Sequence, residues 1–299
     1  MKIHGDQGWD AYPSYLDIFI PHVLNVLDGL NLRITFFIVG QDAALEKNRE
    51  MLRLITMRGH SVGNHSYSHD SWLHLFPKEK IAAEINGAHD LITSVTGQQP
   101  IGFRGPGFCS SCAILDLLVE RGYRYDASIL PTWLGPVGRL YYFWKSDLTK
   151  EEKKQRKELF GKWSEGLRPV KAFTSVLPSG KSIIEIPVTT IPLLKVPFHL
   201  SYLLYLSRFS PAIMHAYLTV AIQLCKITRT SPSFLLHPLD LIGGDQIRDL
   251  KFFPGMDLPS AKKTEVFTSV IRRLQANFDL VDLNSFSQRV SNLRAIACR

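Results

Sequence analysis

Short apolar runs alternate with longer helical patterns along almost the whole chain, and this rhythm constrains the fold more than any other feature. It is the pattern of βαβ units, in which a helix connects each strand to the next. The sequence therefore predicts a mainly parallel sheet covered by helices. The expected strands are residues 32–39, 61–65, 101–104, 124–126, 183–187, 233–237 and 279–283. The expected helices are residues 14–30, 46–58, 77–95, 111–121 and 259–277.

Length and composition agree with a single α/β domain. The chain has 299 residues, 45% of them hydrophobic and 21% charged, which excludes a disordered, collagen-like or coiled-coil chain. Its length suits one large α/β barrel. Neither a repeat of fixed period nor a low-complexity linker divides the sequence. We therefore expect one domain over residues 1–299, with an insertion at about 140–228.

Two segments interrupt the rhythm. Residues 145–171 carry nine Lys or Arg against five Asp or Glu, which is half of the net charge of +8. Thr149 and Glu152 fit a capping box, so we interpret this stretch as a solvated helix and expect no nucleic-acid partner. A basic patch also suits anionic lipid or an acidic glycan.

The second interrupting segment, residues 196–227, is apolar apart from a narrow stripe formed by His215, Thr219 and Gln223. We expect a helix packed into the core; the alternative is a lid resting on a membrane surface or a lipid tail. The longest uncharged run, residues 209–225, contains Pro211 and is shorter than the ~20 residues of a spanning helix, so we predict no transmembrane segment.

The cysteines and the first residues favour the cytoplasm. Cys109, Cys112, Cys225 and Cys298 are too few and too unevenly spaced for a secreted disulfide scaffold. We expect the Cys-x-x-Cys of Cys109 and Cys112 to be two small buried side chains. Residues 1–6 contain no apolar stretch typical of a signal peptide. These observations predict a cytoplasmic protein, with the inner face of the membrane as the alternative location.

Polar residues follow the ends of separate predicted strands. His65, Arg104, Asp126, the Glu185-Ile186-Pro187 step and His237 each stand at the carboxyl end of one strand. Because the carboxyl ends of parallel strands share one face, and sites are built on that face, these residues are expected to meet. This convergence predicts an enzyme.

The strongest local signal lies in residues 59–69, where glycines bracket a strand end and His65 and His69 are separated by three residues. Two imidazoles at this spacing reach one ion if the chain turns as it leaves the strand. Zn²⁺ accepts such nitrogen ligands and also needs a third ligand and an open position. We therefore predict a metal site at His65 and His69.

Two further strand ends carry candidate groups. Arg104 precedes a Gly-Pro-Gly turn, and its guanidinium either orients a catalytic carboxylate together with Asp126 or forms a purely structural ion pair with it. His237 ends an apolar strand and has Asp240 nearby to set its tautomer, which is the arrangement that a general acid requires.

Taken together, these motifs resemble the polysaccharide deacetylase family, of NodB-homology and carbohydrate esterase type. The resemblance covers residues 35–283 and rests on the Thr-Phe-Phe-Ile-Val-Gly of residues 35–40, residues 59–69, the Phe-Arg-Gly-Pro-Gly of residues 103–107, Asp126, and Leu236-His237-Pro238. It implies a distorted (β/α)7-type barrel with inserted basic and apolar segments. It also implies a divalent metal, usually Zn²⁺, held by one Asp and two His, and hydrolysis of an N-acetyl or O-acetyl group on a sugar.

Carried over position by position, the resemblance makes His65 and His69 metal ligands. Arg104 becomes the residue that positions the base, Asp126 its support, and His237 the general acid. We also expect Asn64, Pro106, Gly107 and Phe108 to contact the substrate, with backbone N–H groups of the Pro106–Phe108 turn facing the oxyanion.

The amino-terminal residues depart from the family pattern, which places a base Asp and a metal Asp on the first strand. Here Asp6 aligns with the base and Gln7 stands in place of the metal carboxylate. Three explanations stay open. The true first strand lies upstream of Met1, or His4 or Asp6 completes the site in another way, or the protein is catalytically inactive. Asp6 is our candidate base.

The expected function is therefore metal-dependent removal of an N-acetyl or related acyl group from an amino sugar. The apolar segment and the basic patch favour a lipid-linked or cell-envelope glycan and peripheral contact with a membrane. The alternatives are a carbohydrate-binding module without catalysis and a metal-independent amide hydrolase on the same barrel.

Overall fold

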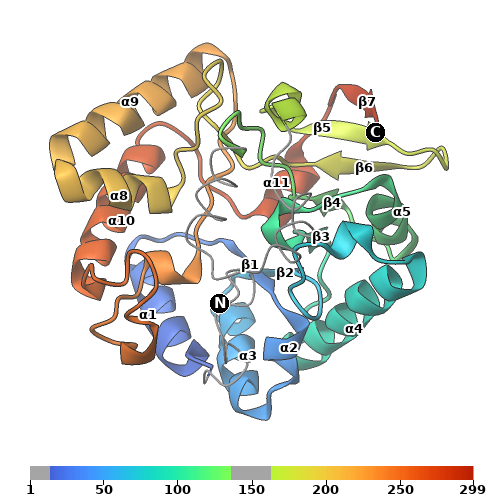
Figure 1. Ribbon diagram of the computed structural model, residues 1–299, viewed down its shortest axis with the longest axis horizontal. Helices are drawn as coiled ribbons and strands as arrows, with labels where there is room; N and C mark the ends of the chain where they lie inside the picture. The colour runs from blue at the N-terminus through green and yellow to red at the C-terminus, as the bar shows by residue number, and fades with distance from the viewer. Residues whose placement is uncertain (1–13, 136–162, 299) are drawn as a thin grey trace, which may run out of the picture.

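The computed structural model describes residues 14–135 and 163–298. In Figure 1, helices surround a central sheet. Its order is β1-β2-β3-β4-β6-β5-β7. The seven strands are β1 (Thr35–Ile38), β2 (Ser61–Asn64), β3 (Gly102–Phe103), β4 (Tyr125–Asp126), β5 (Phe173–Val176), β6 (Ser182–Glu185) and β7 (Ala295–Ala297). The strands β1, β2, β3, β4 and β6 run parallel, which confirms the predicted α/β class.

Five expected strands are confirmed and two are replaced. Residues 233–237 and 279–283 form no strand in the structure. Instead, Ser233 exchanges hydrogen bonds with Thr189, and the N–H of Leu283 donates to the Oγ1 of Thr35. The strands β5 and β7 were not expected. β5 pairs antiparallel with β6 through a turn at Gly180, and β7 lies parallel to β5.

The described strands form an open sheet rather than a closed ring. Within residues 14–135 and 163–298, β1 pairs only with β2, so the other side of β1 is an edge. The segments 231–237 and 278–283 line the same cavity as β1, and the Leu283 N–H bonds to Thr35 of β1. The barrel expected from the resemblance is thus present as seven strands that do not close between β1 and β7.

The five expected helices all form, within a few residues of their predicted ends. They are α1 (Leu16–Gly29), α3 (Arg49–Met57), α4 (Lys78–Thr96), α5 (Cys112–Glu120) and α10 (Ser260–Gln275). Local chemistry explains two boundaries. The Ser111 hydroxyl accepts the N–H of Ile114 at the start of α5, and Gly97 ends α4 in the left-handed conformation.

Shorter elements complete the chain. The remaining α-helices are α2 (Gly40–Ala44), α8 (Leu200–Phe209), α9 (Pro211–Ile227) and α11 (Leu283–Arg289). Single 3₁₀ turns lie at Glu46–Asn48, Leu73–Leu75, Pro106–Phe108, Trp163–Leu167, Pro238–Asp240 and Arg248–Leu250. The main core packs α1, α4 and α10 against β1 and β2, with Leu24, Val62, Ile92 and Phe267 fully buried.

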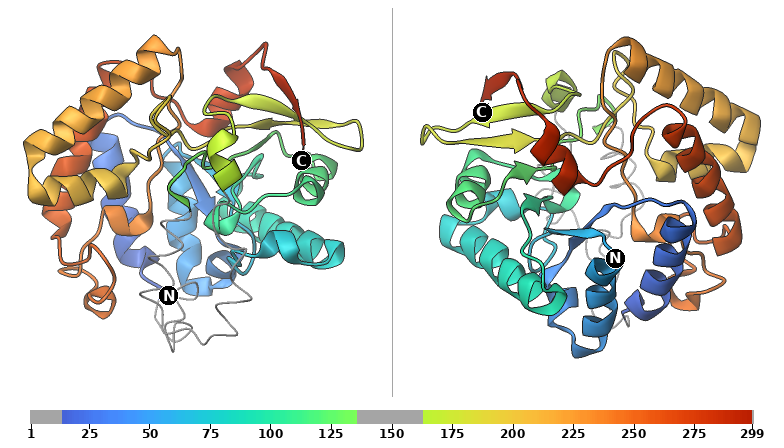
Figure 2. Two further views of the ribbon diagram at one scale, coloured as in Figure 1. Left: turned by 45° about the horizontal axis from the view of Figure 1, so that its top comes forward. Right: turned by 180° about the vertical axis from the view of Figure 1, so that it is seen from behind.

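The apolar segment forms two helices instead of one. Ser210 ends α8 and caps α9, because its side chain accepts the N–H of Ile213 and Pro211 cannot continue α8. Figure 2 shows α8 and α9 together on the side of the molecule away from the β5–β6 hairpin. Leu203 and Leu218 are buried in the core, as expected for a packed segment.

The polar stripe of α9 has a structural explanation. Arg273 of α10 contacts the imidazole of His215 and donates to the hydroxyl of Thr219 at 2.6 Å. Two of the three stripe residues therefore bind the neighbouring helix. Among the described residues, no helix is long and apolar enough to cross a membrane.

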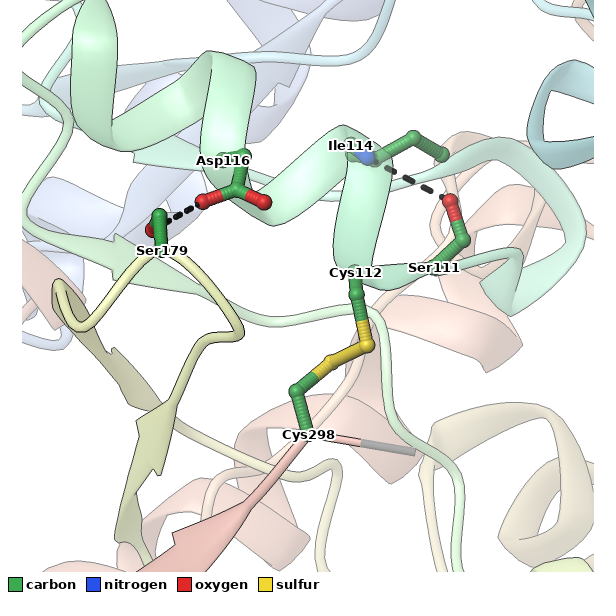
Figure 3. Close-up of a disulfide and its surroundings, with 6 residues drawn as sticks. All are labelled: Ser111, Cys112, Ile114, Asp116, Ser179 and Cys298. Carbon is green, nitrogen blue, oxygen red and sulfur yellow. Dashed lines mark hydrogen bonds between the residues drawn. A yellow bond between two sulfur atoms is a disulfide. The ribbon is translucent and has the colours of Figure 1, made fainter.

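The cysteines correct one expectation. Cys112 at the start of α5 forms a disulfide with Cys298 after β7, with 5.9 Å between the two Cα atoms (Figure 3). Cys109 and Cys225 are free and buried. The prediction that Cys109 and Cys112 are both small buried thiols is thus wrong for Cys112. The sequence did not show that the carboxy-terminal residues return to α5. The expected capping box of Thr149 and Glu152 lies outside the described residues.

Candidate active site

The parallel register brings the predicted strand ends into one row. Ile38, Asn64, Phe103, Asp126 and Glu185 are successive partners across β1, β2, β3, β4 and β6. A cavity of about 2190 Å³ opens at this end of the sheet, and its wall includes His65, His69, Arg104 and His237. The four side chains were predicted to converge, and the structure brings them to one cavity.

His65 and His69 stand on a loop that turns sharply after β2. Ser66 and His69 both adopt left-handed backbone angles, with φ of 60° and 55°. The turn brings the two imidazoles together, with ring centroids 4.7 Å apart and the planes at 71°. Strained backbone of this kind persists only where the surroundings fix it, and it is concentrated at functional sites.

A hydrogen bond fixes the tautomer of His65. Its Nδ1 lies 2.5 Å from the backbone carbonyl oxygen of Arg104, which can only accept, so Nδ1 carries the hydrogen. The lone pair is therefore on Nε2. Burial, reinforced by the charge of His69, holds the pKa of His65 well below its ordinary value. A neutral imidazole oriented by a backbone carbonyl is a common form of metal ligand.

Glu84 holds the histidine loop and was missed by sequence reasoning. Its carboxylate accepts the N–H groups of Tyr67 and Ser68 and the hydroxyl of Ser68, at 2.7 to 3.1 Å. Glu84 is buried on α4, between Ile81 and Ile85. A charged residue within the apolar stripe of an amphipathic helix is the signal that would have identified it.

Arg104 begins the next turn. Its guanidinium lies over the Phe37 ring, 4.4 Å from the centroid, and its Nε donates to the carbonyl of Ala127 at 3.0 Å. Burial lowers the pKa of Arg104 to about 10, so it stays charged at neutral pH. A buried cation at a cavity wall favours an anionic partner there.

The turn after Arg104 depends on two glycines. A Cβ at Gly105 would lie 2.0 Å from the carbonyl oxygen of Cys109, so no other residue fits there. Gly107 has a φ of +62° and faces Ser71. Gly107 and Phe108, two of the four expected substrate contacts, line the cavity, and so does Gly105.

Asp126 does not pair with Arg104 in the way the sequence indicated. It is fully buried, and its carboxylate accepts the hydroxyl of Ser128 at 2.6 Å and the Ser128 N–H at 3.1 Å. No ion pair between Asp126 and Arg104 occurs among the described residues. Asp126 therefore belongs to the support of the site and not to the cavity wall.

His237 and Asp240 form the arrangement predicted for a general acid. Asp240 lies 3.5 Å from the His237 Nδ1 and accepts the His237 backbone N–H at 2.9 Å and the Ser201 hydroxyl at 2.8 Å. The His237 side chain is 49% exposed and lines the cavity, whereas Asp240 is buried. An exposed imidazole backed by a buried carboxylate can transfer a proton to a bound ligand.

His199, which the sequence analysis did not single out, lies next to His237. The two ring centroids are 5.7 Å apart, and His199 is buried. Burial, with the charge of His237 next in importance, lowers the pKa of His199 to about 3, so its ring is neutral.

Other predicted residues lie elsewhere or outside the description. Asn64 is fully buried, and its amide donates to the Ile85 carbonyl and the Tyr123 hydroxyl while it accepts the Ser66 N–H. It supports the loop and does not line the cavity, and buried Pro106 is likewise absent from the wall. Asp6 lies outside the described residues. Within the described ranges no three His, Cys, Asp or Glu residues are clustered to hold a metal.

Comparison with known families identifies the segment that carries the two histidines. Residues 6–125 match a family model described as "Polysaccharide deacetylase". This segment of the chain is therefore similar to the polysaccharide deacetylases. This segment contains His65, His69, Arg104 and the glycine turn of the candidate site, while Asp126 and His237 lie beyond its end. The resemblance inferred from the motifs is thereby confirmed.

Curated relatives agree with the family model. A "Peptidoglycan deacetylase" from Helicobacter pylori is 29% identical over 114 residues, or 38% of this chain and 38% of that protein. A "Peptidoglycan-N-acetylglucosamine deacetylase" from Bacillus cereus is 31% identical over 88 residues, or 29% and 31% of the two chains. The chain thus spans little more than a third of the length of these relatives.

Solved structures are also similar. A putative polysaccharide deacetylase from Mycobacterium smegmatis is 17% identical with a TM-score of 0.49, and the match covers 91% of this chain and 76% of that one. A family 4 carbohydrate esterase from Streptomyces lividans is 27% identical over 39% of this chain and 57% of its own, with a TM-score of 0.35.

Proposed function

We propose that this chain removes the N-acetyl group of an amino sugar in a metal-dependent reaction. The observation that carries the proposal is the meeting of His65, His69, Arg104 and His237 at one cavity. The relatives named as peptidoglycan deacetylases, from Helicobacter pylori and Bacillus cereus, support an amide of a cell-envelope glycan as the substrate.

The histidine pair fits a divalent cation. The Nε2 lone pair of neutral His65 is available because its Nδ1 is bound to the Arg104 carbonyl, and the His69 ring lies beside it. Imidazole nitrogens are good ligands for Zn²⁺ and related ions. His65 and His69 would hold the ion. At the position of the family's metal carboxylate this sequence has Gln7, so His4 or Asp6 would complete the site. When bound, such an ion acts as a Lewis acid toward an acyl carbonyl.

The chain's own groups perform the proton transfers. Asp6 is the candidate base that takes a proton from the attacking water. His237, oriented by Asp240 and Ser201, donates a proton to the leaving amine. Within the Gly105–Phe108 turn, the Gly105 and Phe108 N–H groups are already bonded to Ser128 and to the Gly105 carbonyl, and Pro106 has no N–H. The Gly107 N–H is thus the group of this turn that would stabilise the developing negative charge, and Arg104 adds a fixed positive charge at the same wall.

The surroundings of the cavity favour a lipid-linked or membrane-proximal substrate. The volume of about 2190 Å³ exceeds the roughly 300–1,000 Å³ of common small-ligand sites. Tyr205 and Phe252 are exposed and line the cavity. No acidic residue stands between Glu185 and Asp240 in the sequence, so the face built by α8 and α9 suits anionic lipid headgroups.

The disulfide is relevant to the cellular compartment in which the protein functions. Disulfides such as Cys112–Cys298 persist in oxidising surroundings and are rare where thiols are kept reduced. We therefore propose a location outside the cytosol, in place of the cytoplasmic one expected from sequence. An extracytoplasmic location also suits a cell-envelope glycan as substrate.

The proposal is tested by metal content and acetate release together. Purified wild-type chain is expected to retain a divalent ion and to release acetate from N-acetylglucosamine oligomers or peptidoglycan fragments. His65→Ala and His69→Ala are expected to lose the ion and to slow acetate release by more than the ~10–100-fold typical of lost outer-sphere partners. His22→Gln, which changes a histidine on α1, serves as the matched control.

Two outcomes would overturn the proposal. Metal retention without acetate release on any of these glycans would indicate a binding module. Acetate release that is unaffected by loss of the metal would indicate a metal-independent hydrolase.

A further inference from the structure

Two carboxyl side chains meet on neighbouring strands at the end of the sheet. Asp126 of β4 and Glu185 of β6 are direct register partners, with 0% and 2% of each residue exposed. The two carboxyl groups are therefore neighbours, and each affects the pKa of the other. A carboxylate can only accept, so two carboxyl groups in such contact share a proton.

The other contacts of the pair indicate where the proton lies. Asp126 uses both oxygens to accept hydrogen bonds from Ser128, at 2.6 and 3.1 Å. The Oε2 of Glu185 has no hydrogen-bond partner among the described residues and is buried. The donors thus stabilise the charged form of Asp126, and Glu185 is the group that carries the proton.

The charged and titratable surroundings agree with this assignment. Arg104, Tyr125 and Cys109 interact electrostatically with Asp126, and Arg168 interacts with Glu185. Burial first, and then the charge of Asp126, holds the pKa of Glu185 well above its ordinary value. Burial also raises the pKa of Asp126.

The pair is connected to the candidate active site through one hydroxyl. Ser128 donates to Asp126 and accepts the N–H of Gly105 at 2.7 Å. Gly105 opens the turn whose backbone lines the cavity, and the preceding Arg104 binds the carbonyl of Ala127. A change in the orientation of Asp126 is therefore transmitted to the turn.

We propose that Glu185 is a positioning residue: it supplies the proton shared with Asp126, and thereby holds Asp126, Ser128 and the Gly105–Phe108 turn in place. The consequence for catalysis rests on the proposed deacetylase function. The positioning itself does not, because it is measurable in the absence of substrate.

The first test compares thermal stability against pH for wild type, Glu185→Gln and Asp282→Asn. The pKa of Glu185 is higher in the folded protein than in the unfolded chain, where it is ~4.3. The stabilisation that Glu185 contributes to the fold is therefore complete below pH ~4.3 and is lost as pH rises through the folded pKa. The Gln side chain of Glu185→Gln is neutral at every pH. As pH rises from ~4.3 to the pKa of Glu185 in the folded protein, the Tm of wild type should therefore fall relative to that of Glu185→Gln by about 2–4 °C for each pH unit.

Asp282→Asn provides the matched control with the opposite sign. Burial opposes ionisation of Asp282, but hydrogen bonds from Ser285 and Ser61 outweigh it and lower its pKa. The stabilisation contributed by Asp282 is therefore present above the pKa of Asp in the unfolded chain and is lost as pH falls. If the Tm difference between Glu185→Gln and wild type does not change with pH, the proposal that Glu185 and Asp126 share a proton is wrong.

The second test measures hydrogen–deuterium exchange of the peptide covering residues 103–109. Glu185→Ala should raise its exchange rate about tenfold or more, Glu185→Gln should keep it near wild type, and Asp282→Asn should leave it unchanged. Unchanged exchange in a folded Glu185→Ala protein would overturn the positioning role. If the chain is a deacetylase, Glu185→Ala should also lower kcat by up to about 10²-fold with little change in KM, and Glu185→Gln should restore it.

Discussion

At the scale of single residues, burial gives the imidazoles at the cavity different uses. His65 is half-buried, and a backbone carbonyl fixes its hydrogen on Nδ1, so it offers a lone pair. His237 is half-exposed and lies beside the carboxylate of Asp240, so it can exchange a proton with a ligand. The same side chain therefore suits a metal ligand at one strand end and a general acid at another.

Replacement of Asp240 tests this division. Burial opposes ionisation of Asp240, but hydrogen bonds from His237 and Ser201 outweigh it and lower the pKa of Asp240. We expect Asp240→Asn to slow deacetylation about tenfold or more, and His237→Gln to slow it by about 10²–10⁴-fold. Initial rates of acetate release measure both effects.

The stability of Asp240→Asn should depend on pH in a defined direction. The stabilisation that ionised Asp240 contributes to the fold is complete above ~3.9, the pKa of Asp in the unfolded chain. It is lost as pH falls through the pKa of Asp240 in the folded protein. Wild type should therefore be more stable than Asp240→Asn at neutral pH, and the difference in Tm should shrink in acid. Asp279→Asn, which removes an exposed ion pair with Arg289, should change Tm little at any pH.

At the scale of elements, α5 anchors the antiparallel edge of the sheet. Figure 3 shows the Cys112–Cys298 disulfide at the start of α5 and the Ser179 hydroxyl donating to Asp116 on the same helix, at 2.5 Å. The first contact holds the chain after β7, and the second holds the β5–β6 turn. Both attach to α5 a part of the sheet that sequence periodicity did not predict.

Removal of the disulfide tests this anchor. The bond closes a loop with a sequence separation of 186, so its loss should cost about 2–5 kcal/mol. Cys112→Ser and Cys298→Ser should each lower Tm to that of the reduced wild type and become insensitive to reductant. Cys109→Ala should keep the reductant effect. Four free thiols per oxidised chain, counted by mass spectrometry after alkylation, would contradict the bond.

At the scale of the whole molecule, exposed apolar side chains concentrate in one stretch of the chain. Of the fifteen large hydrophobic side chains exposed in the described residues, eight lie between residues 193 and 227, which includes α8 and α9. The stretch contains Lys195, Arg208 and Lys226 but no acid, and the chain carries a net charge of +8. A basic apolar face of this kind suits an anionic membrane surface.

Vesicle sedimentation tests this face. We expect wild type to bind vesicles of equal parts phosphatidylglycerol and phosphatidylcholine and to dissociate as salt rises. Replacing Tyr205 and Phe209, 59% and 70% exposed, with Ser should weaken binding about tenfold or more. Met57→Ser, which removes a 74% exposed side chain from α3, is the control and should leave binding unchanged. Equal binding of all three proteins would remove the membrane proposal.

The sequence by itself determined the features that depend on local periodicity. Apolar runs and glycine stops located α1, α3, α4, α5 and α10, and the ends of the runs placed His65 and Arg104 at one edge of a parallel sheet. His237 follows a segment that forms no strand, but it lines the same cavity. These predictions succeed because helix and strand periods are written in neighbouring residues, and because parallel strands align their carboxyl ends.

Only the tertiary structure decided the features that join distant residues. Glu185 meets Asp126, Glu84 holds the histidine loop, and Cys298 reaches Cys112 across 186 positions. The strands β5 and β7 are short and need each other and β6 to form, so their own residues carry little signal. The energy of such contacts comes from groups far apart in the chain, and no local pattern records it.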